Sequence, residues 1–228
     1  MNDKGFYVQL HIHTAETSAC GQASGAEIAR ACKDAGYDMI VITDHFMNAN
    51  IGCPRDWPWE DQVEYLFRGY EAAKAEGDKI GLEVLFGWET FNAGPEFLTY
   101  GLGKDFLLAN PDLAKLDAPD YLDRVRKAGG FVIHAHPFRR RDYIPLFTPD
   151  AKSVEAFEVW NAAHTDHSCD EQAQAMAEEY GLICTAGSDA HRTESVTGGA
   201  MRFFHPVHTT DELVAALRAR EFEIVRQL

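Results

Sequence analysis

Short apolar runs alternate along the chain with longer amphipathic stretches, which predicts strands that are each followed by a helix. The run over residues 39–43 is continuously apolar, as is typical of a strand buried on both faces. The strands are expected at residues 6–12, 39–43, 80–88, 98–102, 131–133, 154–159, 183–186 and 201–204. This order of elements favours βαβ units and a largely parallel sheet.

Helix start and stop signals fall between the apolar runs. Ser24 and Glu27 form a capping-box pattern, and Gly36 provides a stop. Gly77 is expected to end the next helix, and Pro119 lies where the first turn of another is expected. We therefore expect helices over residues 24–35, 60–76, 118–128, 170–180 and 210–220.

About seven β/α units follow one another without a break in composition, and no internal repeat is visible. The 228 residues, 46% of them hydrophobic, supply one substantial core. We predict a single α/β domain over residues 1–228, folded as a closed or nearly closed barrel. The longest irregular stretches, 46–59 and 137–150, are expected to wall the active site.

Net charge and the absence of targeting signals in the sequence indicate which binding partners and which cellular compartment to expect. The formal net charge is −15, from 36 acidic and 21 basic residues, so no long nucleic acid is expected to bind. The first five residues carry no basic region before an apolar stretch, and no run approaches the ~18 apolar residues of a membrane span. We expect a cytoplasmic protein that does not contact membranes. Its five widely spaced cysteines predict free thiols.

Histidines and carboxylates follow directly after the predicted strands. His11 and His13 are two residues apart, so the pleat directs both side chains to one face. The other strand ends carry His45, Glu89, His134, His136, Asp189 and His191. In a β/α barrel these positions form the catalytic rim. Mixed imidazole and carboxylate ligands predict zinc, manganese or iron, and one carboxylate bridging two cations suits a two-metal hydrolase.

Taken in chain order, several of these segments resemble the successive motifs of the PHP (polymerase and histidinol phosphatase) family. The segments are Leu10-His11-Ile12-His13-Thr14, Ile42-Thr43-Asp44-His45, Gly87-Trp88-Glu89, Ala135-His136-Pro137 and Gly187-Ser188-Asp189-Ala190-His191. The resemblance spans nearly the whole chain. It implies a distorted (β/α)7 TIM-like barrel, two or three divalent cations (Zn, Mn or Fe), and a stand-alone phosphoesterase.

The resemblance also implies a role for each ligand. One cation would be held by His11, His13, Glu89 and Asp189. Glu89 would bridge to a second cation at His136, and His45 and His191 would hold a third.

Two positions depart from the family pattern. Family members usually place an acidic residue before a glycine soon after the first motif, and here Glu16 or Cys20 takes its place, or the third cation binds weakly. The family also tends to place a histidine in the strand after the bridging glutamate, and residues 97–101 contain none. His134 either supplies the missing ligand or contacts a ligand residue without binding the cation itself.

The predicted activity is hydrolysis of a small phosphorylated substrate by a hydroxide that bridges the metals. The resemblance and this chemistry together assign catalytic roles to Glu89, Asp189, His45 and His191. Either of these histidines would assist proton transfer where it is not fully occupied as a ligand. Loss of Glu89 is expected to abolish both metal binding and activity.

Arginines near the predicted rim are candidates for binding phosphate. Arg192 follows the last motif, and Arg139 and Arg140 follow the His136-Pro137 turn. The triplet 139–141 equally fits a solvated loop. Two alternatives stay open: hydrolysis of short oligonucleotides or nucleotides, and a non-catalytic metal-binding regulatory module. The oligomeric state is also open.

Overall fold

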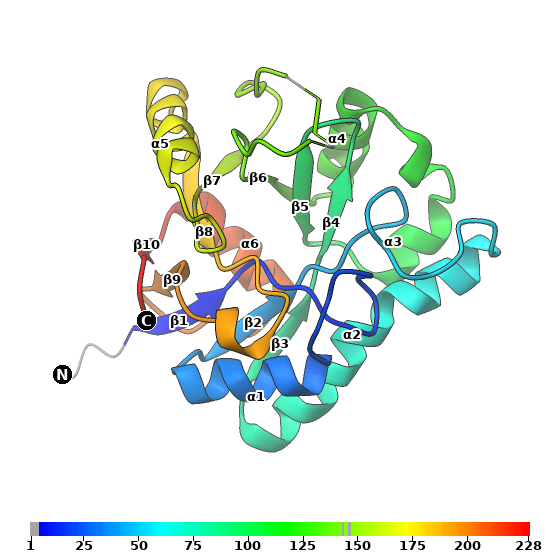
Figure 1. Cartoon of the computed structure of the whole chain (residues 1–228), viewed down its shortest axis with the longest axis horizontal. Helices are drawn as coiled ribbons and strands as arrows, with labels where there is room; N and C mark the ends of the chain where they lie inside the picture. The colour runs from blue at the N-terminus through cyan, green and yellow to red at the C-terminus, as the bar shows by residue number, and fades with distance from the viewer. Residues whose placement is uncertain (1–4, 143, 146) are drawn as a thin grey trace.

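A computed structural model describes residues 5–142, 144–145 and 147–228. Within them the strands form two mixed five-stranded sheets, ordered β10-β9-β1-β2-β3 and β4-β5-β6-β7-β8 (Figure 1). The first sheet contains β1 (Phe6–Gln9), β2 (Met39–Ile42), β3 (Glu83–Phe86), β9 (Ala200–Phe203) and β10 (Phe222–Val225). The second contains β4 (Trp88–Phe91), β5 (Glu96–Tyr100), β6 (Phe131–Ala135), β7 (Ala156–Asn161) and β8 (Ile183–Gly187).

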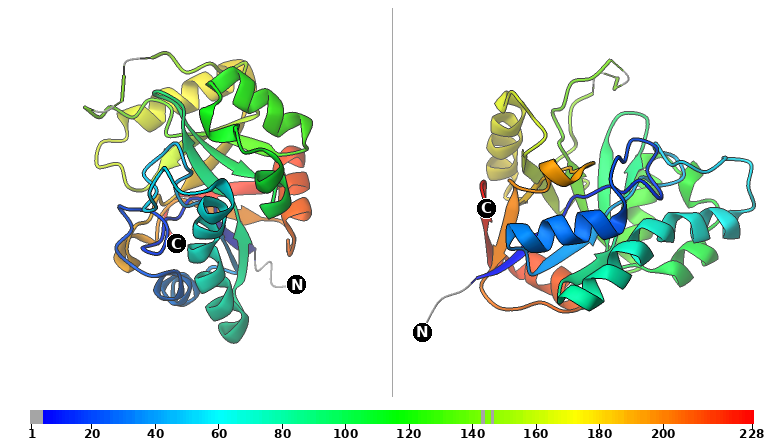
Figure 2. Two further views of the ribbon diagram at one scale, coloured as in Figure 1. Left: turned by 90° about the vertical axis from the view of Figure 1, so that its right-hand side faces the viewer. Right: turned by 60° about the horizontal axis from the view of Figure 1, so that its bottom comes forward.

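Helices cover the outer faces of both sheets. α1 and α2 lie side by side, and α2 packs on β3 (Figure 2). α4 packs on β6, and α5 packs on β7. The helices are α1 (Gly25–Ala35), α2 (Trp59–Ile80), α3 (Lys104–Ala109), α4 (Ala118–Lys127), α5 (Ser168–Tyr180) and α6 (Thr210–Ala219), with 3-10 turns at Leu113–Lys115 and Thr193–Ser195. No helix of the described ranges has both the length and the apolar character that crossing a membrane requires.

The predicted closed (β/α)7 barrel is wrong, because the chain changes sheet at Gly87. β3 pairs with β2 in parallel, whereas β4, which begins one residue after Gly87, pairs antiparallel with β5. A Cβ at Gly87 would lie 2.8 Å from the carbonyl oxygen of Thr99, so the crossing backbone leaves no room for a side chain. Isolated bridges link the two sheets, from Ile12 to Ala190 and from His45 to Glu89.

Several antiparallel pairs replace the expected parallel repetition. β5 pairs antiparallel with both β4 and β6, and β9 does so with β1 and β10. Hydrophobic periodicity indicates that a strand exists but not its direction. α3 and β10 were not predicted. The expected strand 80–88 is two strands in different sheets.

The predicted start and end of α1 are confirmed, whereas the predicted end of α2 at Gly77 is wrong. Ser24 and Glu27 form the reciprocal capping box, and Gly36 ends α1 in the left-handed conformation. Gly77 does not end α2, which continues to Ile80 with Gly81 as its cap. A Cβ at Gly77 would lie 2.7 Å from the Leu82 carbonyl oxygen, so this glycine serves close packing.

An apolar core joins the two sheets and α6. Val8 from the first sheet, Leu98 and Phe131 from the second, and Leu213 from α6 belong to one buried cluster. Each such buried side chain contributes about 1.5–3 kcal/mol through loss of apolar exposure. Residues 46–58 are irregular, as expected. The expected loop 137–150 includes positions 143 and 146, which lie outside the described residues, as do residues 1–4.

Candidate metal centre

The predicted strand-end ligands come together at one end of the two sheets. His11 and His13 follow β1, His45 follows β2, and His136 follows β6. The others are Glu89 within β4, and Asp189 and His191 after β8. Three groups of these side chains place possible ligand atoms within 4.8 Å of one another: His11, His13 and Asp189; His11, Glu89 and His136; and His13, His45 and His191.

His11 and His13 form the middle of the centre, and both are fully buried. Their Nε2 atoms lie 3.2 Å apart. Nδ1 of His11 lies 2.9 Å from the Glu158 carboxylate, which fixes the ring and directs Nε2 toward the other ligands. Burial lowers the pKa of His11, but the carboxylates of Asp189, Glu158 and Glu89 outweigh it and hold the pKa well above its usual value.

Each oxygen of Glu89 faces imidazole nitrogens. Oε1 lies 3.3 Å from His11 Nε2 and 3.2 Å from His136 Nε2. Oε2 lies 3.0 Å from His45 Nδ1 and 3.5 Å from His13 Nε2. Burial raises the pKa of Glu89, yet His11 and the other imidazoles hold it well below its usual value. The carboxylate therefore lies between two groups of candidate ligands.

Asp189 joins the imidazole pair to a buried arginine. Oδ1 lies 3.3 Å from His13 Nε2 and 3.5 Å from His11 Nε2. Oδ2 accepts a hydrogen bond from the Arg139 guanidinium. Burial raises the pKa of Asp189, but Arg139 and His11 hold it well below its usual value. The side chain is therefore an anion at neutral pH.

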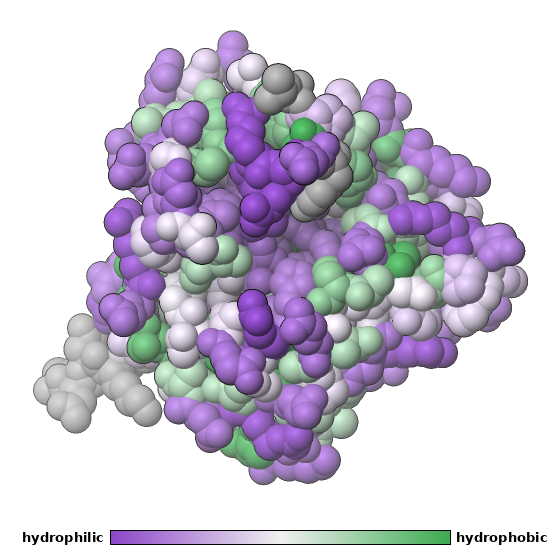
Figure 3. Space-filling model, viewed as in Figure 1, coloured by the Kyte–Doolittle hydropathy of each residue, from purple (hydrophilic) through white to green (hydrophobic). Residues whose placement is uncertain are grey.

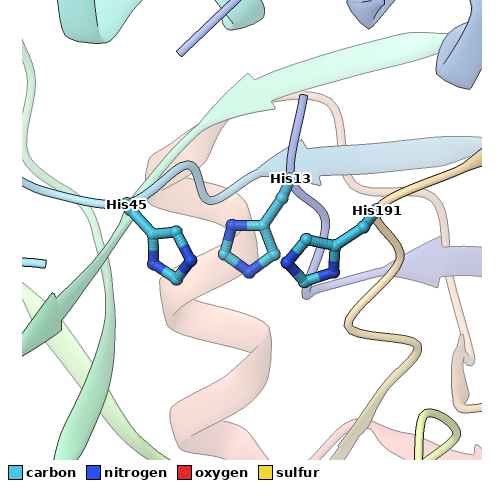
Figure 4. Close-up of side chains that lie close together, drawn as sticks. All are labelled: His13, His45 and His191. Atoms are coloured by element: carbon cyan, nitrogen blue, oxygen red, sulfur yellow. The ribbon is translucent and has the colours of Figure 1, made fainter. Parts of the chain in front are cut away.

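The third group contains three neighbouring imidazoles, with His13 between His45 and His191 (Figure 4). The ring centroids of His13 and His45 are 4.3 Å apart, and those of His13 and His191 are 4.4 Å apart. Nδ1 of His191 donates to the carbonyl oxygen of Asp189 at 2.8 Å. This bond occupies Nδ1, so Nε2 is the ring nitrogen that His191 can present to a cation or a proton.

The donor set fits a cluster of divalent cations. Around Nε2 of His11, a second imidazole nitrogen and two carboxylate oxygens converge at 3.2–3.5 Å. Such buried acceptors repel one another unless a positive charge lies among them. Imidazole and carboxylate are the ligands that zinc, manganese and iron use. The side chains of His11, His13, Glu89, His136 and Asp189 therefore suit bound cations.

Two site residues have left-handed backbones, which is costly for residues other than glycine. φ is 31° at His136 and 53° at Asp189. Each such residue costs about 1–3 kcal/mol, so the surrounding contacts must hold it. The backbone N–H of His136 donates to Oε2 of Glu158 at 3.0 Å, and Asn161 Nδ2 donates to the same carboxylate at 2.9 Å.

Other sequence-predicted site residues lie apart from the centre. Glu16 accepts from the backbone N–H of Gly25 at 2.9 Å and so contacts the first turn of α1. His134 is buried among Phe97, Phe147 and Phe157, and burial lowers its pKa to about 3. The pleat does not continue to His136 because β6 ends at Ala135. Glu16 and His134 therefore belong to none of the three ligand groups.

The predicted arginines differ in position. Arg139 is largely buried against Asp189, and its Nε donates to His164 Nε2 at 3.2 Å. Arg140 is exposed and lines a second, smaller hollow beside α5. Arg192 is exposed and lines a separate shallow hollow with Gln22 and Glu27. Of the three, Arg139 alone lines the main cavity of the described chain.

The centre opens into a cavity of about 730 Å³. The face in Figure 3 is hollowed at its centre, with hydrophilic residues inside the hollow. The cavity wall includes Glu89, Asp189, His45 and His191, and Arg141 of the arginine triplet. It also includes two residues not assigned from the sequence, Arg55 and Glu96. Burial raises the pKa of Glu96 to about 8.

Cys20 also lies on this wall, and its Sγ is 3.2 Å from His45 Nε2. Burial raises the pKa of the Cys20 thiol, but hydrogen bonds with His191 and His45 outweigh it and lower the pKa to about 6. This thiol, one of the two candidates to replace the expected acidic residue, is therefore next to two predicted ligands.

Glu158 and Glu96 were missed, although a signal was present in the sequence. Glu158 interrupts the apolar run 156–159, and Glu96 precedes the apolar run 97–98. A carboxylate within a buried strand requires a partner of opposite charge or a hydrogen-bond donor. Both residues point to the centre's side of the second sheet, where Glu158 contacts His11 and Glu96 Oε2 lies 3.6 Å from His136 Nδ1.

The fold and the converging ligands define a candidate polynuclear metal centre of the kind that the sequence motifs predict. The PHP-associated family model matches residues 170–222. No curated protein sequence matches the chain. Together with the solved structures below, this match confirms the predicted resemblance to the PHP domain family.

Solved structures share the fold at low sequence identity. A two-domain protein from Bacteroides vulgatus that contains a predicted PHP-like metal-dependent phosphoesterase has 16% identity and a TM-score of 0.74, over 98% of this chain and 65% of that chain. A protein from Bifidobacterium adolescentis described as a metal-dependent phosphoesterase has 14% identity and a TM-score of 0.57, over 95% and 96%. A lesion-specific endonuclease from Pyrococcus furiosus has 14% identity and a TM-score of 0.60, over 96% and 57%. This chain thus spans less than two thirds of the Bacteroides protein.

Proposed function

We propose that the chain is a metal-dependent phosphoesterase that hydrolyses a small phosphorylated substrate. The observation that carries the proposal is the position of Glu89, whose two carboxylate oxygens each face two imidazoles. A carboxylate flanked in this way is suited to bridge two cations. The solved relatives described as phosphoesterases, which share the fold, support the same class of reaction.

In this proposal the ligands divide among neighbouring cations. His11, His13 and Asp189 would hold the first, His136 would hold the second, Glu89 would be shared between these two, and His45 and His191 would hold the third. Bound divalent cations supply charge neutralisation for the phosphoryl group and activation of the attacking water. The low pKa of Glu89 and Asp189 keeps both side chains ionised, so they can bind cations throughout the neutral range.

Residues of the cavity wall bind and orient the substrate. The guanidinium of Arg139, which lines the cavity, is held by Asp189 and His164 and is therefore oriented before a substrate binds. Arg55 and Arg141 add positive charge to the same wall. The volume of about 730 Å³ suits a small molecule rather than a long polymer. This local charge offsets the acidic net charge for an anionic substrate.

Activity with and without metal tests the proposal. The protein is stripped with a chelator, reloaded with Mn²⁺, Zn²⁺ or Fe²⁺, and assayed with p-nitrophenyl phosphate and a phosphodiester analogue. Reloading is expected to restore turnover. Glu89→Gln is expected to bind less metal and to retain less than about a hundredth of the turnover. A Glu89→Gln protein with full metal content and full turnover would contradict the proposal. If the wild type hydrolyses none of the substrates with any of the metals, a non-catalytic metal-binding module is favoured.

A second candidate is hydrolysis of short oligonucleotides or nucleotides. Arg140 and Arg141 line a second hollow that adjoins the main cavity at Arg139, which provides a local basic surface. The endonuclease from Pyrococcus furiosus has the same fold. Release of nucleotides from a short oligonucleotide at a higher kcat/KM than phosphate release from monoesters would favour this candidate.

A further inference from the structure

Cys20 lies in a loop whose backbone is fixed on both sides. Its neighbour Ala19 donates to the Asn50 carbonyl oxygen at 2.9 Å, and Gly21 donates to that of Ser18 at 2.9 Å. The next residue, Gln22, donates to the carbonyl oxygen of His191 at 2.7 Å. The thiol is thus held beside the backbone that carries His191.

Two imidazoles flank the Cys20 thiol. Sγ lies 3.2 Å from Nε2 of His45, and Cys20 lines the same cavity as His45 and His191. Ring nitrogens of His45 and His191 also lie within 4.8 Å of each other and of a ring nitrogen of His13. The sulfur therefore adjoins one ring of a group in which three imidazoles place their nitrogens close together.

We infer that Cys20 is a thiolate ligand of the cation held by His45 and His191, and that it makes this site selective for a soft divalent cation such as Zn²⁺. The inference rests on the proposed function, because this cation is the third of the proposed cluster. Thiolate and imidazole favour zinc and iron, whereas sites built of oxygen ligands favour manganese and magnesium. Cys20 would therefore set the metal preference of one site within a centre otherwise built of nitrogen and oxygen ligands.

Other residues of the chain fit this role less well. Glu16, the other candidate for the missing acidic ligand, accepts from the Gly25 backbone N–H at the start of α1. Cys32 and Cys53 are buried within apolar clusters. Cys184 is half-buried on β8, where its sulfur accepts from Gln174. Among the described cysteines, Cys20 is the one that shares the main cavity with the ligand group.

Cobalt substitution tests the assignment without reference to turnover. The stripped protein is loaded with Co²⁺, and the thiolate-to-cobalt charge-transfer absorption in the near ultraviolet is recorded. The wild type is expected to show this band, and Cys20→Ser is expected to lose it while Cys184→Ser, the matched control, keeps it. Cys20→Asp is expected to bind Mn²⁺ in the site while its Zn²⁺ affinity falls. Loss of a direct ligand should cost at least about tenfold in Zn²⁺ affinity, since even supporting partners cost ~10–100-fold.

Alkylation of the wild-type protein gives a second measurement that needs no variant to fold. Iodoacetamide should modify Cys20 in the stripped protein, because its thiol lines the open cavity. Added Zn²⁺ should slow this reaction at Cys20 but not at Cys184. Equal rates with and without Zn²⁺, or no Cys20-dependent band with Co²⁺, would overturn the inference. A Cys20-dependent band in a protein without phosphoesterase turnover would uphold the thiolate site and reject the proposed function. Metal-dependent turnover without the band would uphold the proposed function and reject the thiolate site.

Discussion

At the scale of single residues, the neighbouring Arg139 and Arg140 have different environments. Arg139 turns inward to Asp189 and His164 and lines the main cavity. Arg140 is exposed beside α5 and does not line that cavity. A guanidinium held by a carboxylate is oriented before substrate arrives, so it loses little conformational entropy on binding phosphate.

Arg139→Met is expected to lower kcat/KM by about a hundredfold, because it removes an oriented donor to the phosphoryl group. Arg140→Met is the matched control and should stay within about threefold of the wild type, since an exposed arginine outside the cavity contributes little. Steady-state kinetics with p-nitrophenyl phosphate checks both variants. Equal losses in the two variants would show that net charge, rather than orientation, governs substrate binding.

The convergence of the seven candidate ligands could be predicted from the sequence because each follows an apolar run, and a buried strand end fixes where the next side chains lie. Cys20 was placed only as an alternative to Glu16, because a loop has no periodicity that gives its direction. His134 lies two residues from His136, the same spacing as His11 and His13, but it packs among aromatic rings, since the pleat ends before His136. Spacing predicts a common face only while the strand continues.

At the scale of elements, β7 lies between β6 and β8, which both lead to candidate ligands. Glu158 is almost fully buried, and its carboxylate contacts the side chain of His11 beyond β1 and the backbone of His136 beyond β6. A Cβ at Gly187 would collide with Glu158 and His11, so β8 also approaches this carboxylate closely. One side chain of β7 therefore sets the relative positions of three neighbouring elements.

Glu158→Gln is expected to reduce Zn²⁺ affinity by ~10–100-fold, because the amide cannot replace the charge that orients His11. It should also lower the thermal unfolding midpoint. Glu155→Gln provides a matched control, since Glu155 forms an exposed ion pair with Arg218 and contributes little to stability. Titration with Zn²⁺ measures the affinity of both variants, and calorimetry measures their unfolding midpoints. Unchanged Zn²⁺ affinity in Glu158→Gln would show that His11 is oriented by packing alone.

The helices and strands themselves were mostly predictable, whereas their arrangement was not. Capping signals placed α1, and apolar runs located most strands. The closed barrel was wrong because strand direction and partner depend on long-range contacts, and because Gly87, which appears within one apolar run, is where the chain changes sheets. Gly77 was misread for a related reason, since its contact with Leu82 and Val84 is not visible in helix periodicity.

At the scale of the whole molecule, the stability of the metal-free protein should depend on the pair of Cys20 and His45. The pKa of Cys20 is lowered from 9.0 to about 6, and that of His45 is raised from 6.5 to about 10. Burial opposes the charge on both groups. Interactions with His191 and His45 overcome it at Cys20, and interactions with Cys20 and Glu89 overcome it at His45. The folded protein then holds a thiolate beside an imidazolium.

The pH dependence follows from counting protons on this pair. Between about pH 6.5 and 9 the folded and unfolded states each bind one proton, so the pair's contribution is level. The thiol's contribution is lost as pH falls toward 6, and that of His45 is lost as pH rises toward 10. We expect the difference in unfolding free energy between metal-free wild type and Cys20→Ser to form a plateau over pH 6.5–9 and to fall on both sides. Denaturant titration over this range checks it, and a difference that is constant from pH 5 to 10 would contradict it.

The two sheets meet at the bridges from Ile12 to Ala190 and from His45 to Glu89, at the end of the fold where the candidate ligands converge. His11, His13 and His45 come from the first sheet, whereas Glu89, His136 and Asp189 come from the second. Any ion shared by both sets is also a crosslink between the two halves of the molecule. Its release and the separation of those halves are then parts of one equilibrium, so that ion occupancy governs how tightly the molecule is closed.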